Sequence, residues 1–235
     1  SQWRSSWLSR EGVLAVLVLS LLTAWFGWSY LEGDVPFWIG LPLVFLIAVT
    51  VYATSMIYAS LKTVACWHHP LTPACYLMFA ASGGLLASIW LLALADQTLN
   101  SRIYHLTYCL LILTWLVKGF WWRNLDKKLP ESTLESATGL GSFGKVRPLM
   151  PPHTSENYLQ TEMGFVVARR HALKLRVLSI FSGGFIPLVL FISYPTSAVF
   201  LGLALSFHFA GVFVERWLFF AEAKHVVSLY YGEAH

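Results

Sequence analysis

Residues 73–95 read PACYLMFAASGGLLASIWLLALA, a stretch of 23 residues that contains no charged side chain. A helix needs about 20 mostly apolar residues to cross the hydrocarbon core of a bilayer, so this stretch predicts a membrane-spanning helix. Five other runs of the chain have the same character. The six predicted spans are, approximately, Glu11–Tyr30, Pro36–Leu61, Pro73–Ala95, Ile103–Trp122, Val177–Tyr194 and a run from Ser197 towards Tyr231 that is longer than the membrane requires.

The composition of the whole chain agrees with these spans. Of its 235 residues, 57% are hydrophobic and only 12% are charged, whereas soluble domains average about 25% charged residues. We therefore predict an all-α membrane protein in which residues 1–235 form a single transmembrane helical domain of six helices. The basic residues flank apolar runs instead of forming a surface of their own, which argues against nucleic acid as a partner.

The cysteines do not indicate a metal site. The chain has Cys66, Cys75 and Cys109, and no two of them form a CxxC pair. We therefore predict no metal or iron–sulfur centre built by this chain alone, and we interpret the three residues as small apolar side chains within helices.

One long connection, residues 123–176, separates the fourth span from the fifth. Its first half is polar and holds most of its Pro, Gly and Ser residues. Its second half, Ser155–Arg176, has apolar residues at helical spacing and predicts an amphipathic helix that leads into the fifth span. A linker without regular structure is the alternative.

The charges of the connections predict the orientation. If the six helices alternate, nearly all basic residues fall on the side of the N-terminus. Basic connections remain in the cytoplasm, so the N-terminus, the long connection and the C-terminus are predicted to be cytoplasmic. The basic residues of that side are Arg4, Arg10, Lys62, Arg123, Lys127, Lys128, Lys145, Arg147, Arg169, Arg170, Lys174 and Arg176, and the other side has Arg102 with Glu32, Asp34 and Asp96.

Glu11 opens the first predicted helix directly after Arg10. A carboxylate at a helix start is stabilised by the helix dipole, which is one interpretation of this residue. The other is a proton acceptor beside a redox ligand at the cytoplasmic edge, because ionisable groups in membrane spans are costly and mark functional sites.

The second predicted helix ends on the same side in the segment Tyr58–Pro70, which contains Trp67, His68 and His69. A quinone head group needs hydrogen-bond donors at its two oxygens, a route for two protons and an apolar slot for its tail. Tyr58, Trp67, His68 and His69 are therefore candidates for a quinone site with Glu11 and Arg10. A purely interfacial connection is the alternative for the two histidines.

The sixth predicted helix carries a polar stripe. His208, Glu215 and Glu222 are each seven residues apart, so they lie near one line along the helix. Such a stripe must face protein or water instead of lipid. It is either a proton path or an ion-pair lock between helices, and the lock is favoured for Glu215 with Arg216.

Haem binding is disfavoured. Two axial histidines would have to lie at similar depth on facing helices. His105 lies near the outer end of its span and His208 near the middle of its own, a difference in depth of roughly 12 Å at about 1.5 Å per residue.

Four segments together resemble a known family: Trp7–Gly12, Tyr58–Pro73, Ala137–His171 within the long connection, and Glu215–Gly232. They are similar to the membrane anchor of the dimethyl sulfoxide reductase family. The long connection is most similar to the subgroup that serves cytoplasmic sulfite dehydrogenases. The resemblance extends over nearly the whole chain and rests on several motifs that agree.

The resemblance implies a complex of three subunits at the bacterial inner membrane. A catalytic subunit with a molybdenum cofactor would oxidise or reduce the substrate, and a four-cluster iron–sulfur subunit would carry electrons. This chain would be a non-catalytic anchor that binds quinone (ubiquinone or menaquinone) and holds both partners on the cytoplasmic side. Anchors of the family are generally free of haem.

Two motif positions refine this expectation. The carboxylate of the family's Ser-x-Glu segment is tied to quinone use and matches Glu11, whereas the family's His-Leu-Gly motif is absent from this chain. Family members have about eight spans, so the resemblance implies that about two helices and part of the quinone site lie outside this sequence.

We therefore predict an anchor that passes electrons from the iron–sulfur subunit to quinone in sulfite oxidation. The alternatives are a quinol-oxidising anchor of a sulfoxide-type reductase, a proton-coupled transporter and a structural anchor without ligand. Reductase anchors of the family dock their partners on the periplasmic face, together with the Glu segment, whereas the charges place Glu11 on the cytoplasmic face. Direction of electron flow and type of quinone are not decided by these residues.

Overall fold

The computed structural model describes residues 4–33, 36–97, 100–127, 133–147, 149 and 166–223. Within these ranges the chain forms helices and no strand. Six helices are long and apolar enough to cross a membrane, which confirms the prediction of an all-α, multi-pass membrane protein. The six are α1 (Trp7–Glu32), α2 (Phe37–Ala59), α3 (Leu71–Leu94), α4 (Ser101–Lys127), the continuous helix Ala172–Ser193 and α10 (Ala198–Ala221).

The fifth span, Ala172–Ser193, consists of three consecutive segments. They are α8 (Ala172–Ile180), the π-helical turn η3 (Phe181–Phe185) and α9 (Ile186–Ser193). Pro187 has no N–H for the helical ladder, and the wider π-helical turn lies directly before it.

The long connection holds smaller elements. These are α5 (Leu134–Thr138), the 3₁₀ turn η2 (Gly141–Phe143) and α7 (Val166–Arg170). Of the predicted amphipathic helix, residues 155–165 lie outside the described residues, and the rest is helical except for an interruption at His171. The predicted extension of the sixth span beyond residue 223 also lies outside them.

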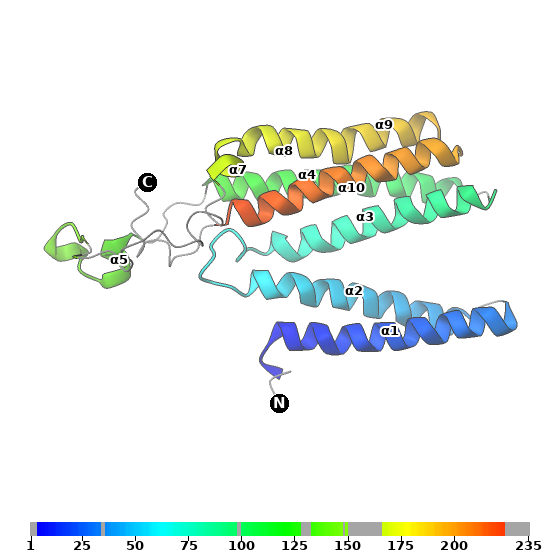
Figure 1. The fold of residues 1–235 in the computed structure, drawn as a ribbon, viewed down its shortest axis with the longest axis horizontal. Helices are drawn as coiled ribbons and strands as arrows, with labels where there is room; N and C mark the ends of the chain where they lie inside the picture. Colours follow the sequence, from blue (N-terminus) through cyan, green and yellow to red (C-terminus); the bar gives the residue numbers. More distant parts are fainter. Residues whose placement is uncertain are drawn as a thin grey trace.

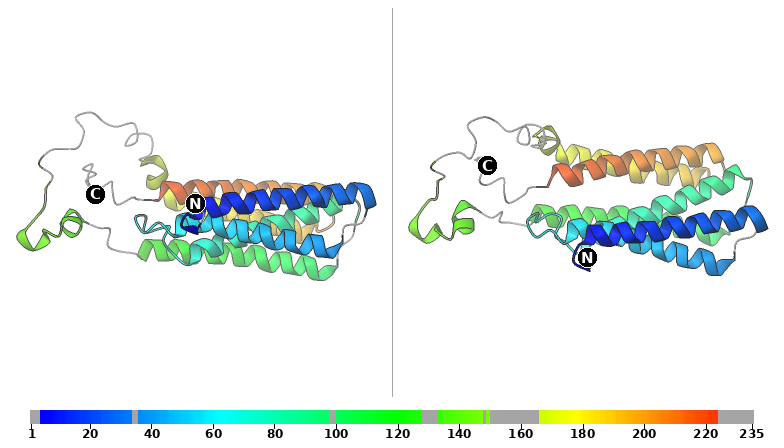
Figure 2. Two further views of the ribbon diagram at one scale, coloured as in Figure 1. Left: turned by 90° about the horizontal axis from the view of Figure 1, so that it is seen from below. Right: turned by 60° about the horizontal axis from the view of Figure 1, so that its bottom comes forward.

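Four of the spans form the centre of the bundle. α3, α4, α10 and the α8–α9 helix pack together, α2 packs against α3, and α1 lies at the edge against α2 (Figure 1). Figure 2 shows the same row of helices from two other directions, with α1 outermost. No residue of α1 is buried, so its apolar sides are available to lipid.

The two ends of the bundle differ in charge. We call the basic end the one at which α1, α3 and α8 begin and α2, α4 and α10 end (Figure 1). The described basic residues of this end are Arg4, Arg10, Lys62, Arg123, Lys127, Arg169, Arg170, Lys174 and Arg176, and the described charged residues of the opposite end are Glu32, Asp96 and Arg102.

The π-helical turn is fastened to its neighbours at Gly183. Gly183 approaches Gly211 of α10 closely, because neither residue has a side chain. In a π-helical turn a backbone carbonyl is released from the regular ladder and needs another partner. The Gly183 carbonyl accepts hydrogen bonds from Trp115 Nε1 at 2.9 Å and from His208 Nδ1 at 2.7 Å, which connects η3 to α4 and α10.

Candidate functional site

A buried cluster of charged groups joins α4 to α10 near the basic end. Lys118 Nζ lies 2.6 Å from Glu215 Oε1, and the two side chains are 1% and 0% exposed. Arg216 Nη2 donates to the same carboxylate at 2.7 Å, and the Lys118 ammonium lies 3.5 Å from the ring centroid of Trp121. Burying charge is costly unless it is paired, so Glu215 keeps the two cations in place.

Aromatic rings lie next to this charged cluster. The ring of Tyr58 is 5.2 Å from that of Trp67, 6.0 Å from that of Tyr76 and 5.5 Å from that of Phe219. The Arg216 guanidinium stands 4.4 Å from the ring centroid of Tyr76. We call Tyr58, Trp67, Tyr76 and Phe219 the aromatic group. It combines α2, α3 and α10 at the basic end.

The connection between α2 and α3 is held by its own side chains. Trp67 Nε1 donates to the backbone carbonyl of Phe219 at 2.9 Å, and His68 Nδ1 donates to that of Ala59 at 2.6 Å. His69 Nδ1 accepts from the backbone N–H two residues further on, at 3.1 Å. The predicted interfacial histidines therefore each use one ring nitrogen to shape this connection.

Glu11 lies at the contact between α1 and α2. Thr54 Oγ1 donates to Glu11 Oε1 at 2.6 Å, and the carboxylate is half-buried. The helix begins at Trp7, four residues before the predicted start, because the extended conformation ends at Ser6. Glu11 therefore lies one turn inside α1, and the Arg10 guanidinium packs 4.3 Å from the Trp7 ring.

The predicted quinone-site residues form two neighbouring groups. Tyr58 and Trp67 are in contact within the aromatic group, whereas Glu11 contacts Thr54. Thr54 and Tyr58 are one turn apart on α2, so they lie on the same side of that helix. The structure thus separates Glu11 from Tyr58 by a single helical turn.

The members of the predicted polar stripe each connect α10 to another helix. His208 and Glu215 have the partners described above. Glu222 lies 2.7 Å from Arg176, whose guanidinium also donates to Asp126 at 2.8 Å. Burial raises the pKa of the Glu222 carboxyl above its ordinary value, although the guanidinium of Arg176 acts in the opposite direction.

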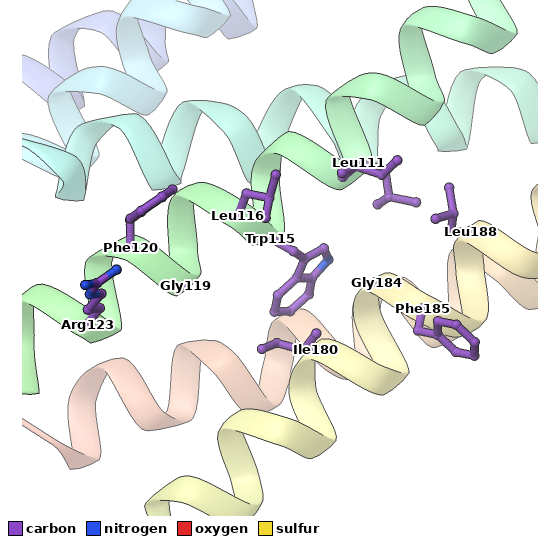
Figure 3. A pocket seen from close by; sticks show the side chains of 11 residues that line it. Leu111, Trp115, Leu116, Gly119, Phe120, Arg123, Ile180, Gly184, Phe185 and Leu188 are labelled. Carbon is purple, nitrogen blue, oxygen red and sulfur yellow. The ribbon is translucent and has the colours of Figure 1, made fainter.

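A groove of about 440 Å³ lies between α4 and the α8–α9 helix. Its walls are almost entirely apolar, and Arg123 lies at the end nearest the basic end (Figure 3). The helices α2 and α3 separate it from α1 (Figure 1), so the groove is remote from Glu11.

Sequence reasoning missed Lys118 and the groove. A lysine inside the predicted span Ile103–Trp122 is a signal that could have been used, because a cation at that depth needs a partner. Its partner Glu215 is far away in the sequence. The groove depends on how two separate helices pack, which no local pattern encodes.

Comparison with known proteins supports the resemblance seen in the sequence. The chain is similar to a membrane-complex relative named as part of the sulfite dehydrogenase of Allochromatium vinosum, with 28% identity over 250 residues that cover 98% of this chain and 75% of the relative. No protein-family model matches the chain, and no solved structure matches it. The predicted resemblance to the membrane subunit of a sulfite dehydrogenase is thereby confirmed.

Proposed function

We propose that this chain is the membrane subunit of a sulfite-oxidising complex and that it passes electrons from an iron–sulfur partner to quinone. The similarity to a sulfite dehydrogenase subunit over nearly the whole chain supports its place in such a complex. Sulfite is a small, water-soluble anion, so its oxidation belongs to a partner subunit outside the bilayer. The membrane chain then supplies the quinone site and the anchorage.

The observation that carries the proposal is the position of Glu11. Its half-buried carboxylate is oriented by Thr54 and lies one turn of α2 from Tyr58, at the basic end of an otherwise apolar helix pair. Reduction of quinone to quinol consumes two electrons and two protons, so the site needs groups that deliver protons beside an apolar surface. Glu11 and Tyr58 are such groups.

The partners dock on the basic end in this proposal, and the charge asymmetry assigns that end to the cytoplasm. Electrons enter beside the aromatic group, and the quinone head group lies next to Glu11 and Arg10. His68 and His69 lie in the adjoining connection and exchange protons with the cytoplasm. Sulfite and water yield sulfate, two electrons and two protons in the partner, and the quinone takes up two electrons and two protons in the membrane.

Replacing Glu11 with glutamine tests this assignment. A glutamine oxygen still accepts the hydrogen bond from Thr54, but the side chain no longer delivers a proton. We expect sulfite-dependent quinone reduction by the complex to fall about 100-fold, because a positioned acid or base contributes about 10²–10⁴-fold. Sulfite oxidation linked to a soluble dye, which accepts electrons before the quinone site, should be unchanged.

Glu32→Gln is the matched control, because Glu32 is an exposed carboxylate at the opposite end of the same helix. It should leave both activities at the level of the unaltered complex. If Glu11→Gln also leaves quinone reduction unchanged, the carboxylate serves only to bind Thr54 and the proposed site is wrong.

A further inference from the structure

We infer that the groove between α4 and the α8–α9 helix binds one anionic phospholipid from the membrane leaflet of the basic end. One acyl chain would lie in the groove and the phosphate would contact Arg123. This site is separate from the proposed quinone site, from which α2 and α3 divide it.

The walls of the groove are held in place by contacts that do not involve a ligand. Trp115 forms its floor, and the indole is fixed by its hydrogen bond to the Gly183 carbonyl and by edge-on packing against Phe79 at 5.2 Å (Figure 3). Gly184 leaves room for this indole, because a Cβ there would lie 2.8 Å from Trp115 Cδ1. Gly119 faces open space, since a Cβ there would meet nothing within 4 Å. The groove is therefore already formed without an occupant.

The length of the groove matches one leaflet. Its lining on α4 extends from Leu111 to Arg123, which is about 18 Å of helix at about 1.5 Å per residue. The hydrocarbon core is about 30 Å thick, so the groove covers about half of it. An acyl chain of a phospholipid has this reach, whereas a transmembrane helix from a partner would need a groove along the whole thickness.

The charge at the end of the groove selects the head group. Arg123 is exposed there, and Lys127 follows one turn later, also exposed. A guanidinium matches the geometry of a phosphate and binds it with two hydrogen bonds. The neighbouring carboxylate of Asp126 is bound to Arg176, so it does not neutralise Arg123. A neutral quinone ring would have no use for this cation.

Native mass spectrometry of the purified complex tests the inference, with phosphatidylglycerol and phosphatidylcholine of identical acyl chains as the probes. The unaltered complex should bind one phosphatidylglycerol at a saturable site, and Arg123→Gln should weaken this binding about tenfold, because it removes charge-assisted hydrogen bonds. Gly119→Leu fills the groove and should abolish the binding. The controls Lys174→Gln, a neighbouring exposed cation, and Gly27→Leu, a glycine of α1 that also faces open space, should have no effect.

Other outcomes would overturn the inference. Equal binding of the two lipids, or no effect of Arg123→Gln, would remove the role of the phosphate. Loss of bound quinone instead of phosphatidylglycerol in Gly119→Leu would identify the occupant as a quinone tail. A dimer that Gly119→Leu dissociates would identify it as a second copy of the chain. Glu11→Gln should leave lipid binding intact, so failure of the quinone proposal is distinguishable from failure of this one.

Discussion

Glu215→Gln is expected to lower the free energy of unfolding by about 3–5 kcal/mol, the range found when one partner of a buried ion pair is removed. The substitution leaves Lys118 and Arg216 close together with a neutral amide between them, and Lys118 is 1% exposed. Two like charges then lie in a medium that solvates neither of them. Loss of helical circular dichroism on titration with a denaturing detergent in mixed micelles measures this effect.

Two further variants locate the cause in the charge imbalance. Glu222→Gln removes another largely buried carboxylate from the end of the same helix, but Arg176 keeps its bonds to Asp126. Its cost should stay within about 1 kcal/mol, as for most single hydrogen bonds. Adding Lys118→Met to Glu215→Gln should restore part of the lost stability, so the two changes should be non-additive by about 1–3 kcal/mol. Additive effects would contradict the pairing.

Gly211→Ala is expected to destabilise the bundle by about 1–3 kcal/mol or more, as overpacking of a tight core does. A Cβ at this position would collide with the backbone of Gly183 and lie 2.7 Å from the carbonyl oxygen of Ser179. Backbone atoms cannot rotate away as a side chain can, so α10 and the α8–α9 helix would have to separate. The same detergent titration measures the loss.

Gly84→Ala is the matched control for this close contact. Gly84 lies in α3, and a Cβ there meets nothing within 4 Å. Alanine is preferred over glycine inside a helix by about 0.5–1 kcal/mol, so this variant should be slightly stabilised. A Gly211→Ala variant as stable as Gly84→Ala would show that the two helices do not meet at Gly211.

The fold was largely predictable because membrane spans have a strong local signal. Each span is a run of apolar residues of the required length, and the six predicted runs correspond to the six helices. The ends were less predictable: α1 begins at Trp7 instead of Glu11, because interfacial residues such as Ser9 and Arg10 continue a helix without being apolar. The π-helical turn at Gly183 was also not predicted, since it depends on the approach of α10.

The candidate site was predictable only in part. Local patterns identified Glu11, Tyr58 and Trp67 as unusual residues at one membrane interface. They did not show that Thr54 orients Glu11 or that Lys118 pairs with Glu215, because both contacts join residues from different helices. The similarity to part of a sulfite dehydrogenase adds the chemical setting that such geometry alone does not supply.

The charged cluster also gives the proposed site a fixed support. Arg216 contacts the ring of Tyr76, which in turn stacks on Tyr58. The ion pair between α4 and α10 therefore holds the aromatic group beside which electrons enter in the proposal. This arrangement predicts that the basic end is rigid before any partner docks.

Sulfite-dependent reduction of a soluble quinone analogue tests the central claim most directly. It compares membranes that contain the complete complex with membranes that contain the partner subunits without this chain. The proposal predicts that quinone reduction is lost without the chain, that dye-linked sulfite oxidation by the partners persists, and that restoring the chain restores quinone reduction. Quinone reduction at an unchanged rate in the absence of the chain would contradict it.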